Sequence, residues 1–371
     1  MRIAVNAVSL NIHHLDSFLT LASQHPEHTF LFFFDKEPQL ADRPINTTAV
    51  VITQPAANPL KWQIWYHLKL PASLKKNKAD VLITEKFISL KTKVPQVLLG
   101  PDLTFLHYPA LLEKKQMAFD KGYTLKFLEK AHLIIVGSIF LKNEIITRFK
   151  IPEEKIKVIF PATPDLSAAT AEQRERMKKK YAGDHEYFIY KGVISAEKNL
   201  VNLLKAFSFF KKRQKSKMQL VIAGERGAKY AEFVHLLQSY KFKEDINLLE
   251  DTTTNEEDQV MAGAYAMVYV PFYERDPFEV IKAMKSEVPL VLAETPLLKE
   301  YGGDAALYAD PENINDIAEK MMLLFKDEQK RKELIEKERR RVTLFETSDT
   351  TGDLWRAIEE AHHKCTLAPE A

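Results

Sequence analysis

The sequence predicts an α/β protein of two domains, each built on a parallel β-sheet, and three observations support this fold class. With 371 residues, the chain exceeds the size at which one hydrophobic core usually keeps growing. Short apolar runs alternate with longer segments of helical periodicity, which is typical of βαβ units. Residues 161–170, rich in Pro, Ser, Thr and Ala, lie between two such series and are the best linker candidate.

The strands are expected where short runs rich in β-branched and aromatic residues lie between turn-forming residues. In the first half, the predicted strands are residues 2–5, 29–34, 49–53, 81–83, 96–99, 133–136 and 157–159. In the second half, they are residues 187–190, 219–223, 246–248, 266–270, 290–293 and 306–308. Two parallel sheets follow from this division.

Helices are expected between the strands, where apolar residues recur at three- and four-residue spacing. These helices are residues 15–23, 117–129, 200–213, 230–240, 279–285 and 314–326. Two more, residues 172–180 and 327–341, are heavily charged, and residues 349–362 carry Leu354, Trp355 and Ile358 on one face.

Composition excludes several classes of function. Lys and Arg number 53 against 51 Asp and Glu, a net charge of +2, and no basic-aromatic tract occurs, so nucleic acid is not an expected partner. Cys365 is the only cysteine, which rules out an intramolecular disulfide and fits a reducing, cytoplasmic compartment. No 18 apolar residues run together, so a membrane-spanning helix is not expected.

Several short motifs follow the predicted strands in a fixed order. They are Val94–Val97 with Asp102–Pro109, Ala131–Ser138 with Glu154–Pro161, Tyr190–Leu200, Val270–Met284 and Gly302–Pro311. In this order they resemble the motifs of the retaining group 1 glycosyltransferases of family 4, which use nucleotide-sugars. Each motif is weak alone, but together they cover nearly the whole chain.

The resemblance implies the GT-B fold, in which two Rossmann-like domains face an interdomain cleft. It implies an N-terminal acceptor domain of residues 1–165, joined by a C-terminal helix at about residues 346–365, and a nucleotide-sugar-binding domain of residues 166–345. Ligands of such sheets bind at the carboxyl ends of the strands, where these motifs fall. Neither a cofactor nor a metal is expected, since the nucleotide-sugar is a substrate.

The resemblance also assigns the residues that hold the donor's diphosphate and sugar. Lys198, near Gly192, would steady the diphosphate, because negative charge develops on it as the glycosidic bond breaks. Glu274, the first acid of the donor motif, would hold hydroxyls of the transferred sugar and is the candidate catalytic residue. Phe278 and Glu279 supply backbone N–H groups at a helix start, a favourable place for a phosphate.

Two loops are expected to border the base of the nucleotide. One contains Gly224 and the other, residues 251–255, contains Thr252 and Thr253. These threonines are equally good candidates for the N-cap of a helix that begins near Glu256.

The second half departs from the family's donor motif at several positions. The second acid, which accepts hydrogen bonds from the ribose, is Lys282, and an ammonium has no acceptor. Lys282 could instead pair with Glu274 or Glu279, or reach a phosphate. Val193 stands at the position of the family's phosphate-binding arginine. Lys191 is close by in sequence, but on a strand it is expected to point to a different face from Gly192. Pro277 lacks the N–H that another residue would offer.

The first half departs from the family as well. The family's glycine pair after the first strand is missing, and its histidine against the transferred sugar is Pro101. His13, His14 or His107 could take the place of that histidine, although surface or loop histidines are the simpler interpretation.

Two functional hypotheses follow. The leading one is a hexosyltransferase that transfers a sugar from a nucleoside diphosphate sugar to a saccharide or lipid-linked acceptor, as in polysaccharide biosynthesis. The alternative is a catalytically inactive relative that acts as a binding or scaffold protein. Residues 60–70 mix aromatics with lysines, which fits peripheral contact with the inner face of a membrane, but such a stripe more often packs on its own sheet.

Overall fold

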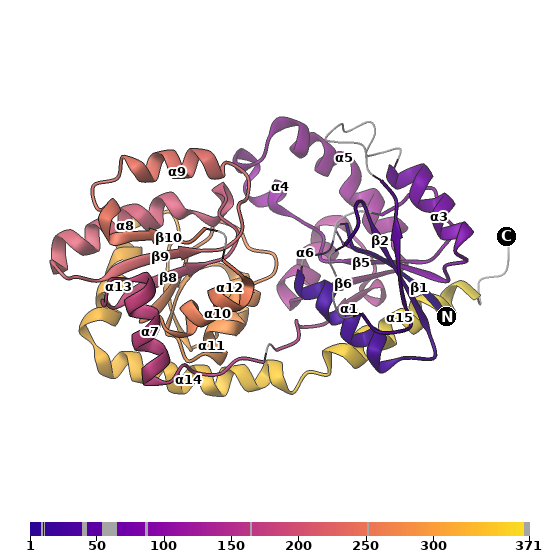
Figure 1. The fold of residues 1–371 in the computed structure, drawn as a ribbon. Helices are drawn as coiled ribbons and strands as arrows, with labels where there is room; N and C mark the ends of the chain where they lie inside the picture. Colours follow the sequence, from indigo (N-terminus) through magenta and orange to yellow (C-terminus); the bar gives the residue numbers. More distant parts are fainter. Residues whose placement is uncertain are drawn as a thin grey trace. The chain divides into compact units, whose positions relative to one another are not determined.

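The computed structural model describes residues 1–8, 10, 12–38, 43–53, 65–85, 88–163, 165–250 and 252–366. The chain forms two compact units (Figure 1), which we call the first and the second domain. The first is Met1–Ala162 with Asp349–Ala371, and the second is Thr163–Ser348. The sequence placed the division at residues 165/166 and 345/346 instead. The predicted arrangement of the two domains about a cleft stays a prediction.

The first domain contains a seven-stranded sheet of order β3-β2-β1-β4-β5-β6-β7. All its neighbouring strands run parallel. The strands are β1 (Arg2–Asn6), β2 (Thr29–Phe34), β3 (Thr47–Val51), β4 (Val81–Glu85), β5 (Gln96–Leu99), β6 (Leu133–Val136) and β7 (Ile156–Val158). The helices are α1 (Ile12–Gln24), α3 (Leu70–Lys76), α4 (Thr104–His107), α5 (Lys114–Lys130), α6 (Ile139–Phe149) and α15 (Thr350–Thr366), with short turns η1 (Trp65–Lys69), η2 (Pro109–Leu111) and η3 (Glu153–Lys155).

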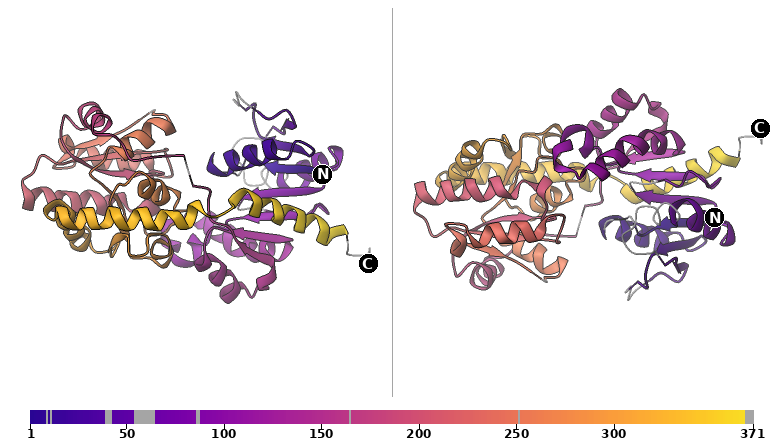
Figure 2. Two further views of the ribbon diagram at one scale, coloured as in Figure 1. Left: turned by 90° about the horizontal axis from the view of Figure 1, so that it is seen from below. Right: turned by 90° about the horizontal axis from the view of Figure 1, so that it is seen from above.

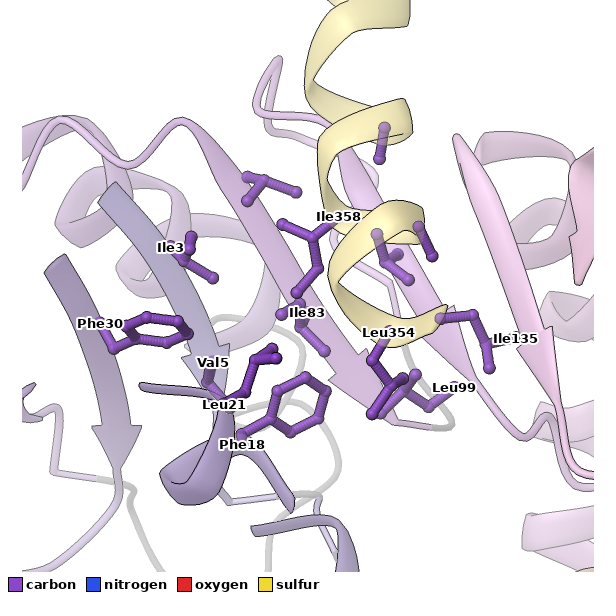
Figure 3. Packing of buried hydrophobic residues seen from close by; sticks show 14 of the residues in the cluster. Ile3, Val5, Phe18, Leu21, Phe30, Ile83, Leu99, Ile135, Leu354 and Ile358 are labelled. Atoms are coloured by element: carbon purple, nitrogen blue, oxygen red, sulfur yellow. The ribbon is translucent and has the colours of Figure 1, made fainter. Parts of the chain in front are cut away.

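The core of the first domain follows from the alternation of side chains along each strand. Ile3 and Val5 point to one face of the sheet, where α1 and α15 cover them (Figure 3). Helix α15 contributes Leu354 and Ile358 to this cluster, so the C-terminal segment belongs to the hydrophobic core of the first domain. The helix runs along the sheet of that domain in both views of Figure 2.

The opposite face of the first sheet buries the described part of the aromatic stripe. Trp65 and Tyr66 are buried there with Leu70, and Trp65 Nε1 donates a 2.7 Å hydrogen bond to the Ile52 carbonyl. These rings therefore stabilise the core and do not present themselves to a membrane. The start of the stripe, residues 60–64, lies outside the described residues. Within the described part of the chain, no helix combines the length and apolar character needed to cross a bilayer.

The second domain contains a six-stranded parallel sheet of order β10-β9-β8-β11-β12-β13. The strands are β8 (Tyr187–Lys191), β9 (Gln219–Ala223), β10 (Ile246–Leu248), β11 (Ala266–Tyr269), β12 (Leu290–Ala293) and β13 (Ala306–Ala309). The helices are α7 (Ala171–Tyr181), α8 (Leu200–Gln214), α9 (Tyr230–Gln238), α10 (Thr254–Ala262), α11 (Phe278–Lys285), α12 (Pro296–Gly302), α13 (Ile314–Lys326) and α14 (Glu328–Glu346), with turns η4 (Ala196–Lys198) and η5 (Lys243–Asp245).

Both sheets have the strand order of a Rossmann fold, which confirms the predicted fold class. Every predicted strand has a counterpart, with ends that differ by at most two residues. The long helix α14 runs along the second domain (Figure 2) and packs against α11.

Candidate functional site

The predicted donor residues gather where the strand order of the second sheet reverses. Strand β8 pairs with β9 on one side and with β11 on the other. Ligands of doubly wound sheets bind at such a switch point, beyond the carboxyl ends of the strands. Lys191 is the last residue of β8, Gly192 follows it, and Glu274 lies in the loop after β11. Gly224 and Thr252 follow β9 and β10.

Gly192 and Gly224 hold the loops after β8 and β9 close together. Gly224 has φ +134°, and a Cβ built on it would lie 2.0 Å from the Gly192 carbonyl oxygen. The Ile194 N–H also donates a 2.8 Å hydrogen bond to the Glu225 carbonyl across these loops. Loop packing alone thus requires glycine at 224, so its place near a nucleoside stays a prediction.

Lys198 and Glu274 form an ion pair, which we call the rim pair. Lys198 Nζ donates a 2.7 Å hydrogen bond to Glu274 Oε2, and 13% of the Lys198 side chain is exposed. The Tyr269 hydroxyl donates to the same oxygen. Backbone N–H groups of Arg275 and Asp276 donate to Oε1 at 2.8 and 3.0 Å. The structure therefore brings together the two residues that the sequence placed on the diphosphate and the sugar.

The surroundings of Glu274 keep it ionised. Burial alone would raise the pKa of this carboxyl, but the Lys198 ammonium, the Tyr269 hydroxyl and the Asp276 N–H outweigh burial and lower it below its usual value. Burial and the Glu274 charge raise the pKa of Tyr269 well above its usual value, so that hydroxyl keeps its proton. Glu274 is thus an ionised carboxylate that is already held in place at the switch point of the second sheet.

Lys282 belongs to a second cluster, deeper in the domain. Its Nζ donates to both Asp258 carboxylate oxygens, at 3.0 and 3.2 Å, and lies 3.6 Å from Glu279 Oε1. The ammonium also lies over the ring of Phe278, 5.2 Å from its centre. Only 3% of the Lys282 side chain is exposed. Of the partners considered from the sequence, Lys282 pairs with Glu279.

Lys191, which the sequence expected to point to a different face from Gly192, joins the same cluster. Its Nζ donates to Glu279 Oε2 at 2.7 Å and lies 3.0 Å from Asp258 Oδ1 and 3.9 Å from Glu257 Oε2. Burial works against the charge of Lys191, but the Glu279 and Asp258 carboxylates outweigh it and raise its pKa. We call Lys191, Lys282, Glu257, Asp258 and Glu279 the buried network.

The remaining predicted residues of the second domain lie at the N-termini of helices α10 and α11. Thr253 caps α10, because its side chain accepts the Glu256 N–H at 3.2 Å, in agreement with the N-cap alternative. Thr252 Oγ1 donates to Glu257 Oε1 at 3.1 Å, which links its loop to the buried network. Phe278, the first residue of α11, is buried. Asp251 lies outside the described residues.

Val193 occupies the position of the family's arginine and is 39% exposed. Its carbonyl accepts a 2.7 Å hydrogen bond from the Tyr190 hydroxyl, which orients the backbone of this loop. The Tyr190 ring stacks on Tyr269, with ring centres 5.7 Å apart. Two buried tyrosines thus hold the site in place: Tyr190 bonds the loop after β8, and Tyr269 bonds Glu274 of the rim pair.

In the first domain, the strand order reverses between β1 and β4, and a histidine lies near that point. Glu85, the last residue of β4, is buried, and its Oε2 lies 3.1 Å from His14 Nδ1. Pro101, at the position of the family's histidine, is buried. The side chain of His13 lies outside the described residues.

His107 has a different partner. Its Nε2 lies 2.7 Å from Glu144 Oε2, an oxygen that also accepts a 3.0 Å hydrogen bond from Arg148 Nε. Of the two histidines with described side chains, His14 is therefore the one that contacts the end of a central strand.

Sequence reasoning missed Glu257, Asp258 and Tyr269. The acids lie in the first turns of α10, 13 and 12 residues before the donor motif begins at Val270, and nothing in their local sequence distinguishes them from solvent-exposed helix acids. Tyr269 ends β11 and reads as an ordinary core aromatic. One signal was available: a lysine in place of a motif acid needs acidic partners once it is buried.

Two family models match the chain one after the other. The model described as Glycosyltransferase Family 4 matches residues 19–164, and the model described as Glycosyl transferases group 1 matches residues 171–341. Together they cover most of both domains.

A curated relative and two solved structures are similar to this chain. O-antigen chain mannosyltransferase B of Escherichia coli is 25% identical over 229 residues, which are 61% of this chain and only 60% of that relative. Sucrose-phosphate synthase from Thermosynechococcus elongatus has a TM-score of 0.76 at 16% identity, over 97% of this chain and 100% of that chain. Anabaena HepE in complex with UDP and glucose has a TM-score of 0.72 at 14% identity, over 97% and 99%. At such identities, the two structures establish the shared fold.

Proposed function

Because the chain belongs to the group 1 glycosyltransferases, we propose that it transfers a hexose from a nucleoside diphosphate sugar to a saccharide or lipid-linked acceptor, with retention at the transferred carbon. The observation that carries the proposal is the rim pair at the switch point of the second sheet. A preorganised carboxylate and an ammonium lie 2.7 Å apart there, the two charges that a sugar and its diphosphate need. The mannosyltransferase and UDP-bound relatives support the same substrate class.

In this proposal, each residue of the rim pair has a separate task. Glu274 accepts hydrogen bonds from hydroxyls of the transferred sugar, since it has no proton to donate. Lys198 turns from Glu274 toward the diphosphate and stabilises the charge that develops there as the bond to the sugar breaks. The N-terminus of α11, which begins at Phe278, adds backbone N–H groups near the same charge. Lysines neutralise the acids of the site, so the proposed reaction uses no bound metal.

The location belongs to the proposal as well. A single cysteine fits the cytoplasm, and a lipid-linked acceptor would bring the protein to the inner face of a membrane. Of the described residues in the aromatic stripe, Leu68 is well exposed, whereas Trp65 and Tyr66 are buried. Any membrane contact through residues 65–70 would therefore not involve the rings of Trp65 and Tyr66.

Isothermal titration calorimetry with UDP, GDP and their hexose conjugates tests the proposal. We expect micromolar binding of at least one nucleotide and a loss of roughly tenfold to a hundredfold in affinity on Lys198→Ala, because a hydrogen bond to a charged group contributes about 1.5–3 kcal/mol. Lys205→Ala, which removes an exposed lysine of α8 in the same domain, is the matched control and should bind as the wild type does.

Two outcomes would decide against this function. No heat at millimolar nucleotide would remove the transferase and favour the inactive scaffold. Binding that survives Lys198→Ala unchanged would mean that the nucleotide lies elsewhere. If nucleotide binds, transfer of labelled hexose to oligosaccharide acceptors then distinguishes an enzyme from a binding protein.

A further inference from the structure

The surface of the second domain at the amino ends of β9 and β10 carries a concentration of positive charge. Residues 211–217, which join α8 to β9, contain five basic residues and no acid. Residues 241–245, which precede β10, contain two lysines and two acids, Glu244 and Asp245. The two segments together thus hold an excess of positive charge larger than the +2 of the whole chain.

One buried lysine joins the two segments. Lys211 Nζ donates hydrogen bonds to the carbonyls of Ser216 and Met218, at 2.7 and 3.0 Å. It also lies 3.0 Å from Asp245 Oδ1, and Gln219 Nε2 donates to the same oxygen at 3.1 Å. The turn after α8 and the turn before β10 are therefore fixed side by side. We call their exposed cations the basic patch, which consists of Lys212, Arg213, Lys215, Lys217, Lys241 and Lys243.

The cations of the basic patch lack acidic partners. Within the part of the chain that the structure describes, none of the six forms an ion pair, and the nearby Asp245 is already paired with Lys211. Other exposed basic residues of this domain are paired, as Lys180 is with Glu256 and Arg339 is with Glu287. Because no acid pairs with the six cations, they create a positive potential that attracts anions to this surface.

The stability of α8 accounts for only part of the basic patch. The last turn of a helix favours cations, because the helix dipole places partial negative charge there. This explains Lys212 and Arg213, which lie in the last turn of α8. It does not explain Lys217, Lys241 and Lys243, which lie outside the helix.

The side chains of the basic patch favour an anionic membrane over a protein or a nucleic acid. Protein interfaces are depleted in lysine and depend on aromatic anchors, whereas five of these six cations are lysines, and the well-exposed large hydrophobic side chains of the described chain lie outside the two segments. Single-stranded nucleic acid stacks on open aromatic rings, but Arg213 lies over the Phe209 ring and Lys241 over the Phe242 ring. Clusters of about four to eight lysines and arginines are typical of surfaces that bind anionic lipid headgroups.

We infer that the basic patch docks the second domain on an anionic phospholipid membrane by electrostatic attraction to the headgroups. The donor residues follow the carboxyl ends of the same sheet, so the docked surface lies at the opposite edge and does not cover them. The inference goes beyond the proposed function, because the contact forms whether or not the protein transfers a sugar. It provides a membrane contact that the buried rings of Trp65 and Tyr66 do not provide.

Co-sedimentation of the full chain with lipid vesicles tests the inference. The protein should sediment with vesicles of an equal mixture of phosphatidylcholine and phosphatidylglycerol but not with phosphatidylcholine alone, and added salt should release it, because ions screen exposed charges. The triple variant Lys212→Gln, Lys215→Gln, Lys217→Gln should bind roughly a hundredfold more weakly, since each cation near an anionic membrane contributes about fivefold. Thermal melts confirm that the variant is folded.

Two further variants make the test specific. The control Lys179→Gln, Lys332→Gln, Arg340→Gln removes the same charge from exposed positions on α7 and α14 and should bind as the wild type does. The double variant Lys241→Gln, Lys243→Gln acts on the other segment of the basic patch and should weaken binding by roughly twentyfold. It decides the test should the triple variant not fold.

Three results would overturn the inference. They are equal sedimentation with both kinds of vesicle, patch variants that sediment as the control variant does, and binding of a short DNA or RNA duplex under conditions in which the vesicles do not bind. Calorimetry with UDP or GDP should give the same result for the patch variants and the wild type. A failure of the proposed nucleotide site therefore leaves the vesicle result unchanged, and the two failures are distinguishable.

Discussion

The rim pair and the buried network join the same chemical groups at the same edge of one sheet, yet they differ in enclosure. Lys198 has one carboxylate partner, Glu274, and part of its side chain reaches solvent. Lys282 and Lys191 are almost fully buried, and each contacts at least two carboxylates. Lys198 can exchange its single carboxylate for a ligand because its own side chain reaches solvent, although Glu274 is buried. A lysine held by several carboxylates in a buried network has no such freedom.

The comparison shows that a charge at a motif position does not reveal its role. Lys198 lies in the Tyr190–Leu200 motif and Lys282 in the Val270–Met284 donor motif, and each was a candidate phosphate contact. The number of partners and the exposure of the lysine separate them. Lys282 contacts two carboxylates and is 3% exposed, and removing one partner of such a buried ion pair costs about 3–5 kcal/mol. Lys198 contacts one carboxylate and is 13% exposed. The rim pair is therefore suited to binding and the buried network to stability.

The largest expected effect is that of Lys282→Glu, which restores the acid of the family motif. It places a fourth carboxylate beside Glu257, Asp258 and Glu279, with Lys191 as the one remaining cation of the network. We expect the free energy of unfolding to fall by about 3–5 kcal/mol, and nucleotide affinity not to rise. Urea denaturation followed by circular dichroism measures the change.

Lys285→Glu is the matched control for that experiment. Lys285 lies one turn further along α11 and pairs with Glu346 near the surface. Its reversal should cost about 1 kcal/mol or less. Equal losses in the two variants would show that enclosure does not separate the two regions, and a stable Lys282→Glu protein with tighter nucleotide binding would mean that the site is merely degraded.

The sequence predicted the strands and sheets well, but it did not predict which charged side chains of the site form ion pairs with one another. Strands are marked by local apolar runs such as Thr29–Phe34, which need no knowledge of distant contacts. Helices α3, α4, α6 and α12 were not predicted. Helices α4 and α12, with four and seven residues, carry too little periodicity. Family motifs located Lys198 and Glu274, since both lie in loops that follow strands.

The buried network could not be predicted, because it depends on where side chains from separate elements end. Lys191 lies on β8, Asp258 on α10 and Glu279 on α11. Alternation along a strand assigns Lys191 to a face but not to a partner, and the last residue of a strand is free to reach past the sheet edge. The sequence shows that Lys282 stands where the family motif has an acid, but it does not show that Asp258 of α10 is its partner.

The buried acid Glu338 sharpens the comparison, because among the described residues no lysine forms an ion pair with it. Glu338 of α14 is fully buried, and burial raises its pKa well above the usual value in spite of the charge of Arg331. We expect Glu338→Met to stabilise the protein by about 1–3 kcal/mol at neutral pH, the range for a buried polar group without full compensation. Urea denaturation at several pH values tests this.

The sign of the pH dependence follows from the raised pKa. Below pH 4.5, the ordinary pKa of the carboxyl in the unfolded chain, Glu338 is protonated in both the folded and the unfolded state. Its ionisation then makes no difference to the free energy of unfolding. As pH rises above 4.5, the unfolded state gains stability by releasing the proton, so the advantage of Glu338→Met should widen toward neutral pH. Glu338→Gln, which cannot titrate, should show the same trend. If the stability gain of Glu338→Met did not change with pH, the destabilising effect of Glu338 would come from its packing and not from its ionisation.

The rim pair should respond to acid in the opposite direction. The lowered pKa of Glu274 contributes stability above 4.5 that is lost as pH falls through its folded value. We expect Lys198→Met to cost about 1 kcal/mol at neutral pH, because Tyr269 and two backbone N–H groups remain bonded to Glu274. The difference from the wild type should shrink below pH 4.5, as seen in denaturation curves. If Lys198→Met lowered the free energy of unfolding as much as Lys282→Glu does, the rim pair would serve mainly to stabilise the fold.

The smallest expected effect is that of Val193→Arg, which restores the family's arginine beside the rim pair. Val193 is exposed and uses its backbone carbonyl rather than its side chain to hold the loop, so the change should leave the free energy of unfolding nearly unaltered. An exposed guanidinium near a diphosphate should contribute about 0.2–1 kcal/mol, which is roughly a 1.4- to fivefold gain in affinity in calorimetry. The gain should vanish when Lys198→Ala is also present if both cations act on one diphosphate held between them. A gain from Val193→Arg that is independent of Lys198 would instead show that the two positions act on the nucleotide separately.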